Sequence, residues 1–436
     1  MTRPDTSPLR IGIAGLGTVG AGVVKLLAAN AGAIAARAGR PVAVTAVSAR
    51  SRGRDRGVDL APYAWEDDAV RLAARDDVDC VVEVVGGSNG PAKALVEAAL
   101  AAGKPVVTAN KALIAHHGQA LAEAAEAAGV ALRAEAGVAG GIPVMKALTE
   151  GLAANRIHRV SGVLNGTCNY ILTEMAATGR GYAEVLAEAQ AKGYAEADPA
   201  FDVGGTDAAH KLAILAAAAF GTRVDFAGVT TEGIERITAA DIETAGDLGF
   251  AIKLLAVARM EAGGLEQRVR PTMVPRESLI GSLPGVTNAV VLEGDFVGTC
   301  AFTGPGAGEG PTASAIVADL MDIARGAAGP LFAQPAAGLR AAERLDYSDE
   351  HAPYYLRFSL LDRPGALAAL ASAIGEAGVS IHRMRQYGRG GARAGAVPVV
   401  IVTHDARREM IDGAVARIAA LDVSAAEPVA IAIEEI

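Results

Sequence analysis

A glycine-rich turn between an apolar strand and a helix is the feature that most constrains this chain. Gly15-Leu16-Gly17-Thr18-Val19-Gly20 follows the apolar segment Arg10–Ala14 and opens a helix predicted over Thr18–Ala29. In this context the first glycine permits a tight turn, the second lets backbone N–H groups approach a pyrophosphate, and the third allows the helix to pack closely on the strand. The helix N-terminus also favours negative charge. We therefore expect a dinucleotide site, the alternative being a similar turn that binds nothing; its expected residues are Gly15, Gly17, Thr18, Val19 and Gly20.

Short β-branched segments alternate with alanine-rich helical segments up to about residue 135. Continuous apolar strands separated by helices are typical of a parallel sheet that is buried on both faces. The sequence therefore predicts an α/β protein whose residues 1–135 form a Rossmann-type, doubly wound dinucleotide-binding domain. Further strands are expected at Val42–Val47, Cys80–Val85, Val106–Thr108 and Val130–Ala134, and further helices at Pro91–Ala102 and Gly118–Ala128.

After residue 135 the pattern changes to glycine-rich segments and longer helices. We expect a mixed α/β domain over residues 136–305, with helices at Tyr182–Ala191, Asp207–Ala219 and Leu248–Met260. Residues 306–349 are expected to return to the nucleotide domain and then form a linker. Residues 350–436 follow the β-α-β-β-α-β order of a ferredoxin-like unit. Its expected elements are strand Tyr354–Leu361, helix Pro364–Ala377, strand Ser380–Tyr387, loop Gly388–Ala396, strand Val397–His404, helix Ala406–Ala420 and strand Pro428–Glu434.

Composition excludes several classes of protein. A net charge of −9 without a basic stripe argues against nucleic-acid binding. Although 51% of the residues are hydrophobic, the longest apolar run is Leu212–Phe220, which is far shorter than the roughly 20 residues that cross a bilayer. The polar segment Met1–Pro8 lacks the apolar core of a signal peptide, and three scattered cysteines suit a reducing compartment. We expect a cytoplasmic protein that binds neither nucleic acid nor membrane.

The end of the second predicted strand bears on the choice of dinucleotide. An NAD enzyme usually carries an acid here for the ribose 2′-hydroxyl, whereas a cation favours the 2′-phosphate of NADP. Strand Val42–Val47 is followed by Ser48-Ala49-Arg50-Ser51-Arg52, which contains no carboxylate. Arg50 is therefore a candidate ligand of the 2′-phosphate, although a solvated arginine loop is equally compatible. The sequence favours NADP(H) and leaves NAD(H) open.

Two lysines are candidates for proton transfer. Lys111 follows the predicted strand Val106–Thr108, at the edge where open α/β sheets bind ligands; an exposed lysine at a helix start is the ordinary alternative. Lys211 lies four residues after Asp207, hence on the same face of a predicted helix. A surface ion pair would be the simplest explanation of that spacing. However, Lys211 begins an otherwise apolar helix after a segment rich in glycine and acids, which is unlike a solvated face.

Five segments stand out in the second part of the chain, namely Ala136–Val144, Val160–Leu172, Gly193–Lys211, Lys253–Leu255 and Gly304–Asp319. They resemble segments of the homoserine dehydrogenase family, in the same order along the chain. The resemblance extends over roughly residues 9–330, and its motifs are long enough to make a chance match remote.

This resemblance implies roles for individual residues. Lys211 would be the acid–base group, with Lys111 assisting proton transfer beside the cofactor. Glu196 and Asp207 would bind the substrate ammonium and orient the site, and Gly306 would return to the cofactor. Residues 136–305 would also mediate dimerisation, giving a homodimer or homotetramer. A monovalent cation, Na⁺ or K⁺, would be bound mostly through the backbone carbonyls of Glu135, Val138, Gly140 and Ile142.

The implied reaction is the reversible, nicotinamide-dependent reduction of L-aspartate 4-semialdehyde to L-homoserine, a step in threonine, methionine and isoleucine biosynthesis. Hydride transfer to the aldehyde carbon leaves negative charge on its oxygen, and a nearby ammonium group stabilises that charge and supplies the proton. Such acid–base help contributes about 10²- to 10⁴-fold. In the oxidising direction the lysine must be neutral, so we expect an alkaline optimum. No kinase domain is expected ahead of the nucleotide domain, and we expect a monofunctional enzyme.

The C-terminal unit carries a second resemblance. Asp362-Arg363-Pro364-Gly365 is similar to the turn of the ACT family, whose small domains pair and bind amino acids near that turn, and the similarity continues through Ile374–Ile381. Attached to this catalytic domain, it implies feedback inhibition, with L-threonine the expected ligand, although some ACT units only dimerise. The expected regulatory residues are Asp362, Gly365, Ala366 and Gln386.

Two other functions compete with this interpretation. A dehydrogenase of a different amino acid or aldehyde could use a thiol, and Cys168 is the candidate nucleophile. Thiol chemistry needs a nearby base, and none is assigned, so Cys168 is better explained as a small packing residue. A non-catalytic amino-acid or redox sensor would keep the nucleotide fold and the ACT unit. A sensor has no need of a proton donor, and the retained lysines and acids therefore argue against it.

Overall fold

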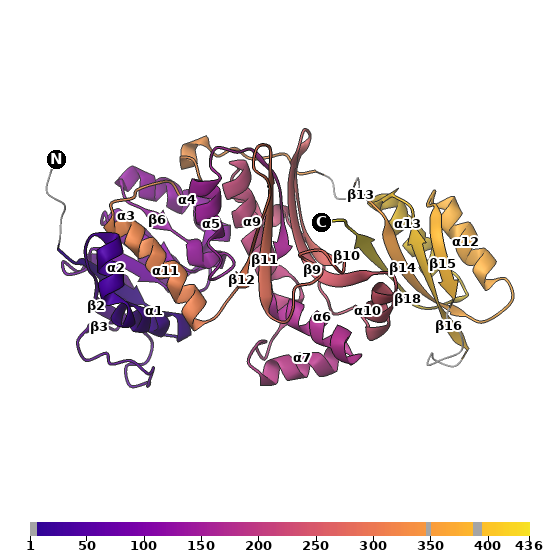
Figure 1. Ribbon diagram of the computed structural model, residues 1–436, viewed down its shortest axis with the longest axis horizontal. Helices are drawn as coiled ribbons and strands as arrows, with labels where there is room; N and C mark the ends of the chain where they lie inside the picture. Colours follow the sequence, from indigo (N-terminus) through magenta and orange to yellow (C-terminus); the bar gives the residue numbers. More distant parts are fainter. Residues whose placement is uncertain (1–6, 346–349, 387–394) are drawn as a thin grey trace.

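The computed structural model describes residues 7–345, 350–386 and 395–436. Three bodies follow one another along its longest axis, a nucleotide-type domain, a central sheet with helices and a C-terminal unit (Figure 1). Tyr387 and most of the expected loop Gly388–Ala396 lie outside the described residues.

The first body is a six-stranded parallel sheet in the order β3-β2-β1-β4-β5-β6. This is the doubly wound arrangement that the alternating apolar and helical segments predicted. The expected strands form within two residues at most ends, and β3 was missed because it is short and only half-buried. The strands are β1 Leu9–Ala14, β2 Val42–Ser48, β3 Ala64–Glu66, β4 Cys80–Glu83, β5 Val106–Thr108 and β6 Leu132–Arg133.

Helices cover both faces of this sheet. On one face Ile11 and Val82 pack with α1 and α11, and on the other Val81 and Val106 pack with α3 and α4. Helix α11 approaches α1 closely at Gly22, where a Cβ atom would lie 2.7 Å from the Glu309 side chain. The helices are α1 Thr18–Ala29, α2 Ala31–Ala38, α3 Pro91–Ala101, α4 Lys111–Ala128 and α11 Glu309–Ala324.

The second sheet runs through the centre of the molecule and continues into the C-terminal unit, with the order β12-β11-β7-β9-β10-β18-β14-β16-β15 and β8 beside β10. Parallel pairing of Thr272 with Ala432 and of Met273 with Ile433 joins the two parts. The central strands are β7 Ile157–Val163, β8 Thr230–Thr231, β9 Phe250–Glu261, β10 Gly264–Pro275, β11 Thr287–Gly294 and β12 Gly298–Pro305.

Helices α6 and α9 pack on one face of the central strands. They carry the segments that the sequence singled out, so the sheet is the platform of the candidate site. The helices of this body are α5 Val144–Lys146, α6 Gly166–Thr178, α7 Tyr182–Ala191, α8 Ala200–Val203, α9 Thr206–Phe220 and α10 Ala239–Asp247.

One expected element is wrong. Leu248–Met260 was predicted to be a helix, but Phe250–Glu261 is strand β9. Its alternate residues pack on opposite faces, Leu254 and Ala256 in the core beneath the helices, Leu255 and Val257 in a second apolar cluster. Because both faces are apolar, the strand shows no alternation of polar and apolar residues, and a buried strand of this kind cannot be distinguished from a buried helix by periodicity.

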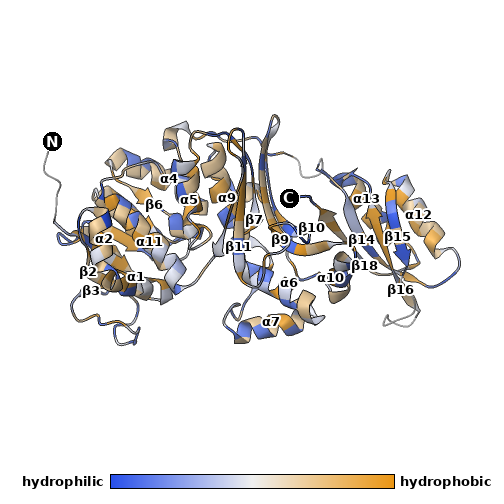
Figure 2. Cartoon of the chain, in the orientation of Figure 1, coloured by the Kyte–Doolittle hydropathy of each residue, from blue (hydrophilic) through white to orange (hydrophobic). Residues whose placement is uncertain are grey.

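The C-terminal unit has the expected β-α-β-β-α-β order, with an antiparallel sheet β18-β14-β16-β15. Its edge strand β15 is largely exposed, and its blue colour shows that it is mostly hydrophilic (Figure 2). A short pair, β13 His351–Ala352 and β17 Ala406–Arg407, flanks it. The main elements are β14 Tyr354–Leu361, α12 Ala366–Glu376, β15 Ile381–Gln386, β16 Ala396–Thr403, α13 Arg408–Ala419 and β18 Ser424–Ile433.

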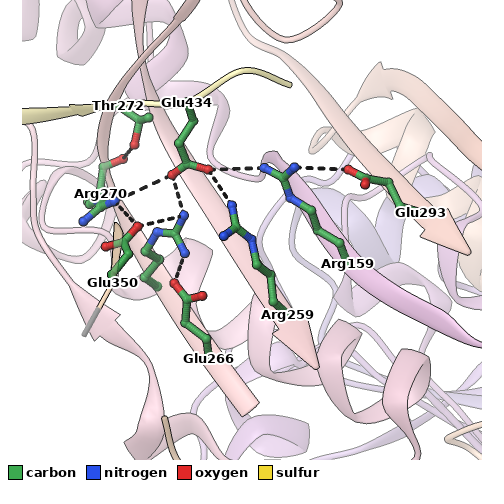
Figure 3. A network of polar contacts seen from close by, with 9 residues as sticks. Arg159, Arg259, Glu266, Arg270, Thr272, Glu293, Glu350 and Glu434 are labelled. Carbon is green, nitrogen blue, oxygen red and sulfur yellow. Dashed lines mark hydrogen bonds and ion pairs between the residues drawn. The ribbon is translucent and has the colours of Figure 1, made fainter. Parts of the chain in front are cut away.

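A buried arginine–glutamate cluster ties the C-terminal unit to the central sheet (Figure 3). Glu434, directly after β18, accepts from Arg268 of β10 at 2.5 Å and from Arg159 of β7 at 3.2 Å. Glu350, in the segment before β13, pairs with Arg270 at 2.5 Å. Breaking such a buried pair costs about 3–5 kcal/mol, so these contacts specify how the C-terminal unit docks.

In the described ranges, no single helix is long and apolar enough to cross a membrane. Helices α1 and α2 together reach that length and composition, but they meet at an angle of 82°.

Candidate active site

The glycine turn has the shape that a pyrophosphate site needs. Gly15 has φ +96°, and a Cβ atom there would lie 2.4 Å from the Val84 carbonyl oxygen. A Cβ at Gly20 would lie 2.0 Å from the Gly15 oxygen, so the third glycine lets α1 pack on the turn. A Cβ at Gly17 would meet no atom within 4 Å, which leaves room for phosphate beside the first turn of α1. The turn therefore fits a dinucleotide.

The end of β2 is lined by arginines. Arg50 is exposed, and Arg56 fastens the following loop to the glycine turn, donating to the Leu16 carbonyl at 2.9 Å. Glu66 pairs in register with Ser48, but Arg75 binds this carboxylate at 2.6 Å. The carboxylate that lies beside the end of β2 is therefore already paired with an arginine. The sequence could not show this pairing, because Arg75 lies nine residues after Glu66.

A buried ion-pair cluster joins the two lysines that the sequence singled out. Lys211 Nζ donates to Asp207 Oδ2 at 2.7 Å and to the Leu164 carbonyl at 2.7 Å. Lys111 Nζ lies 3.1 Å from the other oxygen, Asp207 Oδ1. Lys211 is 7% exposed and Asp207 is 5% exposed, whereas the Lys111 side chain is 32% exposed. One carboxylate thus holds two ammonium groups at the wall of a pocket.

Local sequence explains why these side chains meet. Asn110 caps α4 by accepting from the Leu113 N–H at 3.0 Å, which begins the helix at Lys111. Gly205, with φ +87°, turns the chain into α9, so that Asp207 lies in the first turn and Lys211 one turn later. Burial alone would raise the pKa of the Asp207 carboxyl, but Lys211 and Lys111 hold it well below its usual range.

These residues line a pocket of about 580 Å³ between the first body and the central sheet. It contains Glu196, which is exposed on the segment between α7 and α8. Gly15, Gly17, Thr18, Gly20 and Arg50 lie outside it, on the nucleotide turn and beyond the end of β2. The predicted site residues that line the pocket are Val19, Lys111, Gly140, Glu196, Asp207, Lys211 and Gly306.

The expected cation segment, residues 135–142, lies against the return loop, which begins at Gly306 and leads back to the nucleotide domain. Ala139 and Gly140 have φ of +54° and +56°, and a Cβ at Gly140 would lie 2.5 Å from the Gly306 backbone. The carbonyls of Glu135 and Ile142 accept from the N–H groups of Val138 and Val144. Across the described part of the chain, no group of three or more His, Cys, Asp or Glu side chains is placed to hold a metal ion. A cation here would therefore depend on backbone carbonyls.

The Glu135 side chain has a structural role beside this segment. Its carboxylate accepts from the Met145 and Lys146 N–H groups at 3.0 and 2.8 Å. Burial and the neighbouring Asp319 raise the pKa of Glu135 to about 7, and burial raises the pKa of Asp319 to about 6.

Two further asparagines belong to the site and were not singled out from the sequence. Asn165 donates to Asp202 and Asp207. Asn288 is 1% exposed, lines the pocket, and its Oδ1 accepts no hydrogen bond from the described residues. Asn165 lies inside the segment Val160–Leu172 that resembles the family, and this position could have identified it as a site residue. Asn288 lies outside all such segments, so the sequence offered no indication of its role.

Cys168 does not have the environment of a nucleophilic cysteine. It is fully buried in α6, its Sγ lies 3.3 Å from the Asp202 carbonyl, and burial raises the pKa of its thiol well above the usual value. A reactive cysteine needs the opposite, a thiolate that is stabilised and accessible. The structure therefore supports the interpretation of Cys168 as a packing residue.

The C-terminal unit has its own pocket, of about 440 Å³, at the turn between β14 and α12. Gly365, with φ +88°, precedes α12 and shapes this turn. All four expected regulatory residues line the pocket, Asp362, Gly365, Ala366 and Gln386.

Comparisons with known proteins agree with this geometry. Three family models match, namely the NAD-binding domain of homoserine dehydrogenase over residues 15–135, homoserine dehydrogenase over 143–321, and the ACT domain over 354–422. A homoserine dehydrogenase of Pseudomonas aeruginosa is 44% identical over 98% of this chain and 99% of its own. One of Neisseria gonorrhoeae is 44% identical over 95% and 96%.

Solved structures give the same result. The crystal structure of a homoserine dehydrogenase from Thiobacillus denitrificans is 41% identical, covers 98% of both chains and superposes with a TM-score of 0.91. That of a homoserine dehydrogenase of S. aureus is 30% identical, covers 98% of this chain and 99% of its own, and has a TM-score of 0.75. With a Rossmann-type sheet, two lysines on one buried aspartate and relatives of this identity over nearly the whole length, the chain belongs to the homoserine dehydrogenase family of oxidoreductases.

Proposed function

We propose that the enzyme interconverts L-aspartate 4-semialdehyde and L-homoserine through proton transfer at the Lys111–Asp207–Lys211 cluster. The observation that carries this proposal is the placement of both ammonium groups on one buried carboxylate at the pocket wall. The bound nicotinamide supplies or accepts the hydride. Lys211 gives the proton to the developing alkoxide during reduction and, when neutral, removes it from the hydroxyl during oxidation. Lys111 assists beside the cofactor.

Asp207 supports this chemistry without exchanging the proton itself. Because its pKa is held well below the usual range, it stays charged throughout the working pH and keeps both lysines in place. Preorganised charges of this kind stabilise charge that develops in the transition state.

The pocket offers complementary groups for the amino-acid end of the substrate. Glu196 is an exposed carboxylate at its rim and suits the substrate ammonium, together with Asp207. Gly166 and Thr167 form the first turn of the 13-residue helix α6 and line the same pocket. Free N–H groups at a helix N-terminus bind anions, so these two residues suit the substrate carboxylate.

We propose NADP(H) as the preferred cofactor and NAD(H) as the alternative. The glycine turn would hold the pyrophosphate, Gly306 in the pocket wall would contact the nicotinamide end, and the exposed Arg50 would bind the ribose phosphate. The support for a 2′-phosphate is the arginine-lined end of β2, where the neighbouring Glu66 is neutralised by Arg75.

We propose that Na⁺ or K⁺ binds along residues 135–142. The support is the positive φ of Ala139 and Gly140, which redirects successive peptide groups, and the contact of this segment with Gly306. A cation there would fix the return loop against the pocket.

We propose L-threonine as a feedback inhibitor that binds the 440 Å³ pocket of the C-terminal unit. The pocket contains an acidic side chain, an amide and apolar valines, which suit a small amino acid. The enzyme would act as a homodimer or homotetramer in the cytoplasm, in threonine, methionine and isoleucine biosynthesis.

Steady-state kinetics test these assignments together. Purified enzyme is assayed with L-homoserine and either NADP⁺ or NAD⁺, with and without L-threonine, in Na⁺, K⁺ or choline salts. We expect turnover with a lower KM for NADP⁺, activation by Na⁺ or K⁺ over choline, and inhibition by threonine. An absence of homoserine-dependent reduced cofactor under every condition would refute the proposal.

A further inference from the structure

Asn165 lies where strand β7 gives way to helix α6, one residue after the carbonyl that binds Lys211. It is 3% exposed and is the N-cap of α6. Its Oδ1 accepts from the Cys168 N–H at 2.8 Å. Its Nδ2 donates to Asp202 Oδ1 at 2.8 Å and to Asp207 Oδ2 at 2.9 Å. Both N–H groups and the oxygen of one carboxamide are thus engaged.

Helix capping alone does not require an asparagine at this position. Serine, threonine and aspartate cap helices about as well, because the cap needs only an acceptor oxygen. A carboxamide differs from these residues in offering two further donors on the same side chain. Here those donors reach two carboxylates that lie 37 and 42 residues further along the chain.

The two carboxylates would otherwise repel each other in a buried environment. Burial raises the pKa of Asp202, the negative charge of Asp207 adds to this effect, and the hydrogen bond from Asn165 opposes it. The amide between them therefore reduces this repulsion and fixes the orientation of both carboxylates.

The same contacts determine how Asp207 faces the lysines. Asp207 Oδ2 is shared by Asn165 and Lys211, which leaves Oδ1 directed toward Lys111. The neighbouring Leu164 carbonyl receives the other hydrogen bond of Lys211. Leu164 and Asn165, directly after β7, thus bind Lys211 and Asp207 respectively.

We propose that Asn165 is a positioning residue of the reaction, whose carboxamide separates Asp202 from Asp207 and orients Asp207 between Lys111 and Lys211. This inference rests on the acid–base roles proposed above for the two lysines.

The pH dependence of homoserine oxidation tests this inference, because the loss of a purely structural contact would not shift it. Three charged groups face Lys211, namely Asp207 of its own helix, Lys111 of α4 and Asp202 of α8. Glu196 lines the same pocket. The adjacent residue in α9 is His210, whose ring is neutral because burial lowers its pKa to about 4. An additional carboxylate at position 165 would favour the protonated form of Lys211, whereas a neutral replacement would not.

Two variants keep the helix cap and remove the amide, Asn165→Ser and Asn165→Asp. We expect kcat for homoserine oxidation to fall about 10- to 100-fold in both, the effect of losing a hydrogen bond to a charged group. In Asn165→Asp the alkaline rise of the rate should also move to higher pH, and in Asn165→Ser it should not. Asn30→Asp adds the same charge at the exposed junction of α1 and α2 and should match wild type in rate and pH profile.

The outcomes separate this inference from the proposed function. If wild type oxidises homoserine and Lys211→Ala does not, but folded Asn165→Ser keeps kcat within twofold of wild type, the role of Asn165 is refuted and the lysine chemistry stands. If wild type shows no homoserine oxidation, the proposed function itself fails. If Asn165→Asp does not fold, the rate of Asn165→Ser decides alone.

Discussion

Lys211 Nζ lies 2.7 Å from Asp207 Oδ2, one helical turn away on α9, and both side chains are buried. The lysine ammonium, with that of Lys111, overcomes the effect of burial and keeps the pKa of Asp207 well below its usual range. Asp207 therefore remains an anion under working conditions, which supports the proposal that a lysine exchanges the proton of the reaction.

Removing the charge of Asp207 should change both rate and pH profile. In Asp207→Asn the lysines lose their shared anion, and kcat should fall about 10- to 100-fold. Because the anion favours protonated Lys211, the alkaline rise of homoserine oxidation should move to lower pH. Asp198→Asn changes an exposed acid of the same segment and serves as control. A pH–rate profile of Asp207→Asn identical to wild type would contradict the arrangement.

The end of β2 should discriminate between the two dinucleotides. Arg50→Ala should raise KM for NADP⁺ about tenfold, the effect of one charge-assisted hydrogen bond, and leave KM for NAD⁺ within twofold. Arg54→Ala, which removes an exposed arginine from the same loop, should leave both values near wild type. Equal changes for the two cofactors in Arg50→Ala would exclude a contact with the 2′-phosphate.

The pocket beside Gly365 should control inhibition. Asp362→Ala removes an acid from the pocket wall, and the threonine concentration for half-inhibition should rise about tenfold or more. Glu376 lies at the other end of α12 and pairs with Arg417. Glu376→Ala should keep wild-type inhibition. Unchanged inhibition of Asp362→Ala would place the effector elsewhere.

The arginine cluster should make docking of the C-terminal unit sensitive to acid. Burial opposes ionisation of Glu434, but Arg268 and Arg270 hold its pKa to about 2. A carboxyl whose pKa is lowered on folding stabilises the protein above its unfolded pKa, and this contribution is lost as the pH falls from about 4.5 to about 2. Glu434→Gln should therefore cost about 3–5 kcal/mol at pH 7 and progressively less below pH 4.

Calorimetry of Glu434→Gln at pH 7 and pH 3 measures this difference. Glu427→Gln is the matched control in the strand β18 that leads to Glu434. The Glu427 side chain is 71% exposed in its pair with Arg236, and such surface pairs contribute at most about 1 kcal/mol. If both variants lower the unfolding temperature equally, the cluster does not stabilise the docking.

Local patterns were sufficient to predict most of the fold. Short β-branched segments between alanine-rich ones predicted strands β1, β2, β4 and β5, and helix α1 begins and ends at the expected residues, Thr18 and Ala29. Helix α4 was expected from Gly118, but it begins seven residues earlier at Lys111, capped by Asn110. Asparagine is a residue type that caps helices, so this earlier start could have been recognised from the sequence.

Long-range pairing accounts for what the sequence could not predict. Strand β9 is apolar on both faces and was taken for a helix. The parallel pairing of β10 with β18 joins residues about 160 positions apart, and no local pattern encodes it. In the site, Asp207 and Lys211 were readable from their spacing on one helix. The contacts of Asp207 with Lys111 and Asn165 depend on how separate segments meet.

The most direct test of the central claim compares wild type with Lys211→Ala in homoserine oxidation while cofactor binding is monitored separately. Trp65, the single tryptophan, lies in β3 within 5.8 Å of the Arg52 and Arg56 guanidinium groups, so its fluorescence reports on the cofactor loop. We predict that Lys211→Ala binds NADP⁺ as wild type does and turns over at least about 100-fold more slowly. A variant that binds the cofactor and retains the wild-type rate would contradict the assignment of Lys211 as the acid–base group.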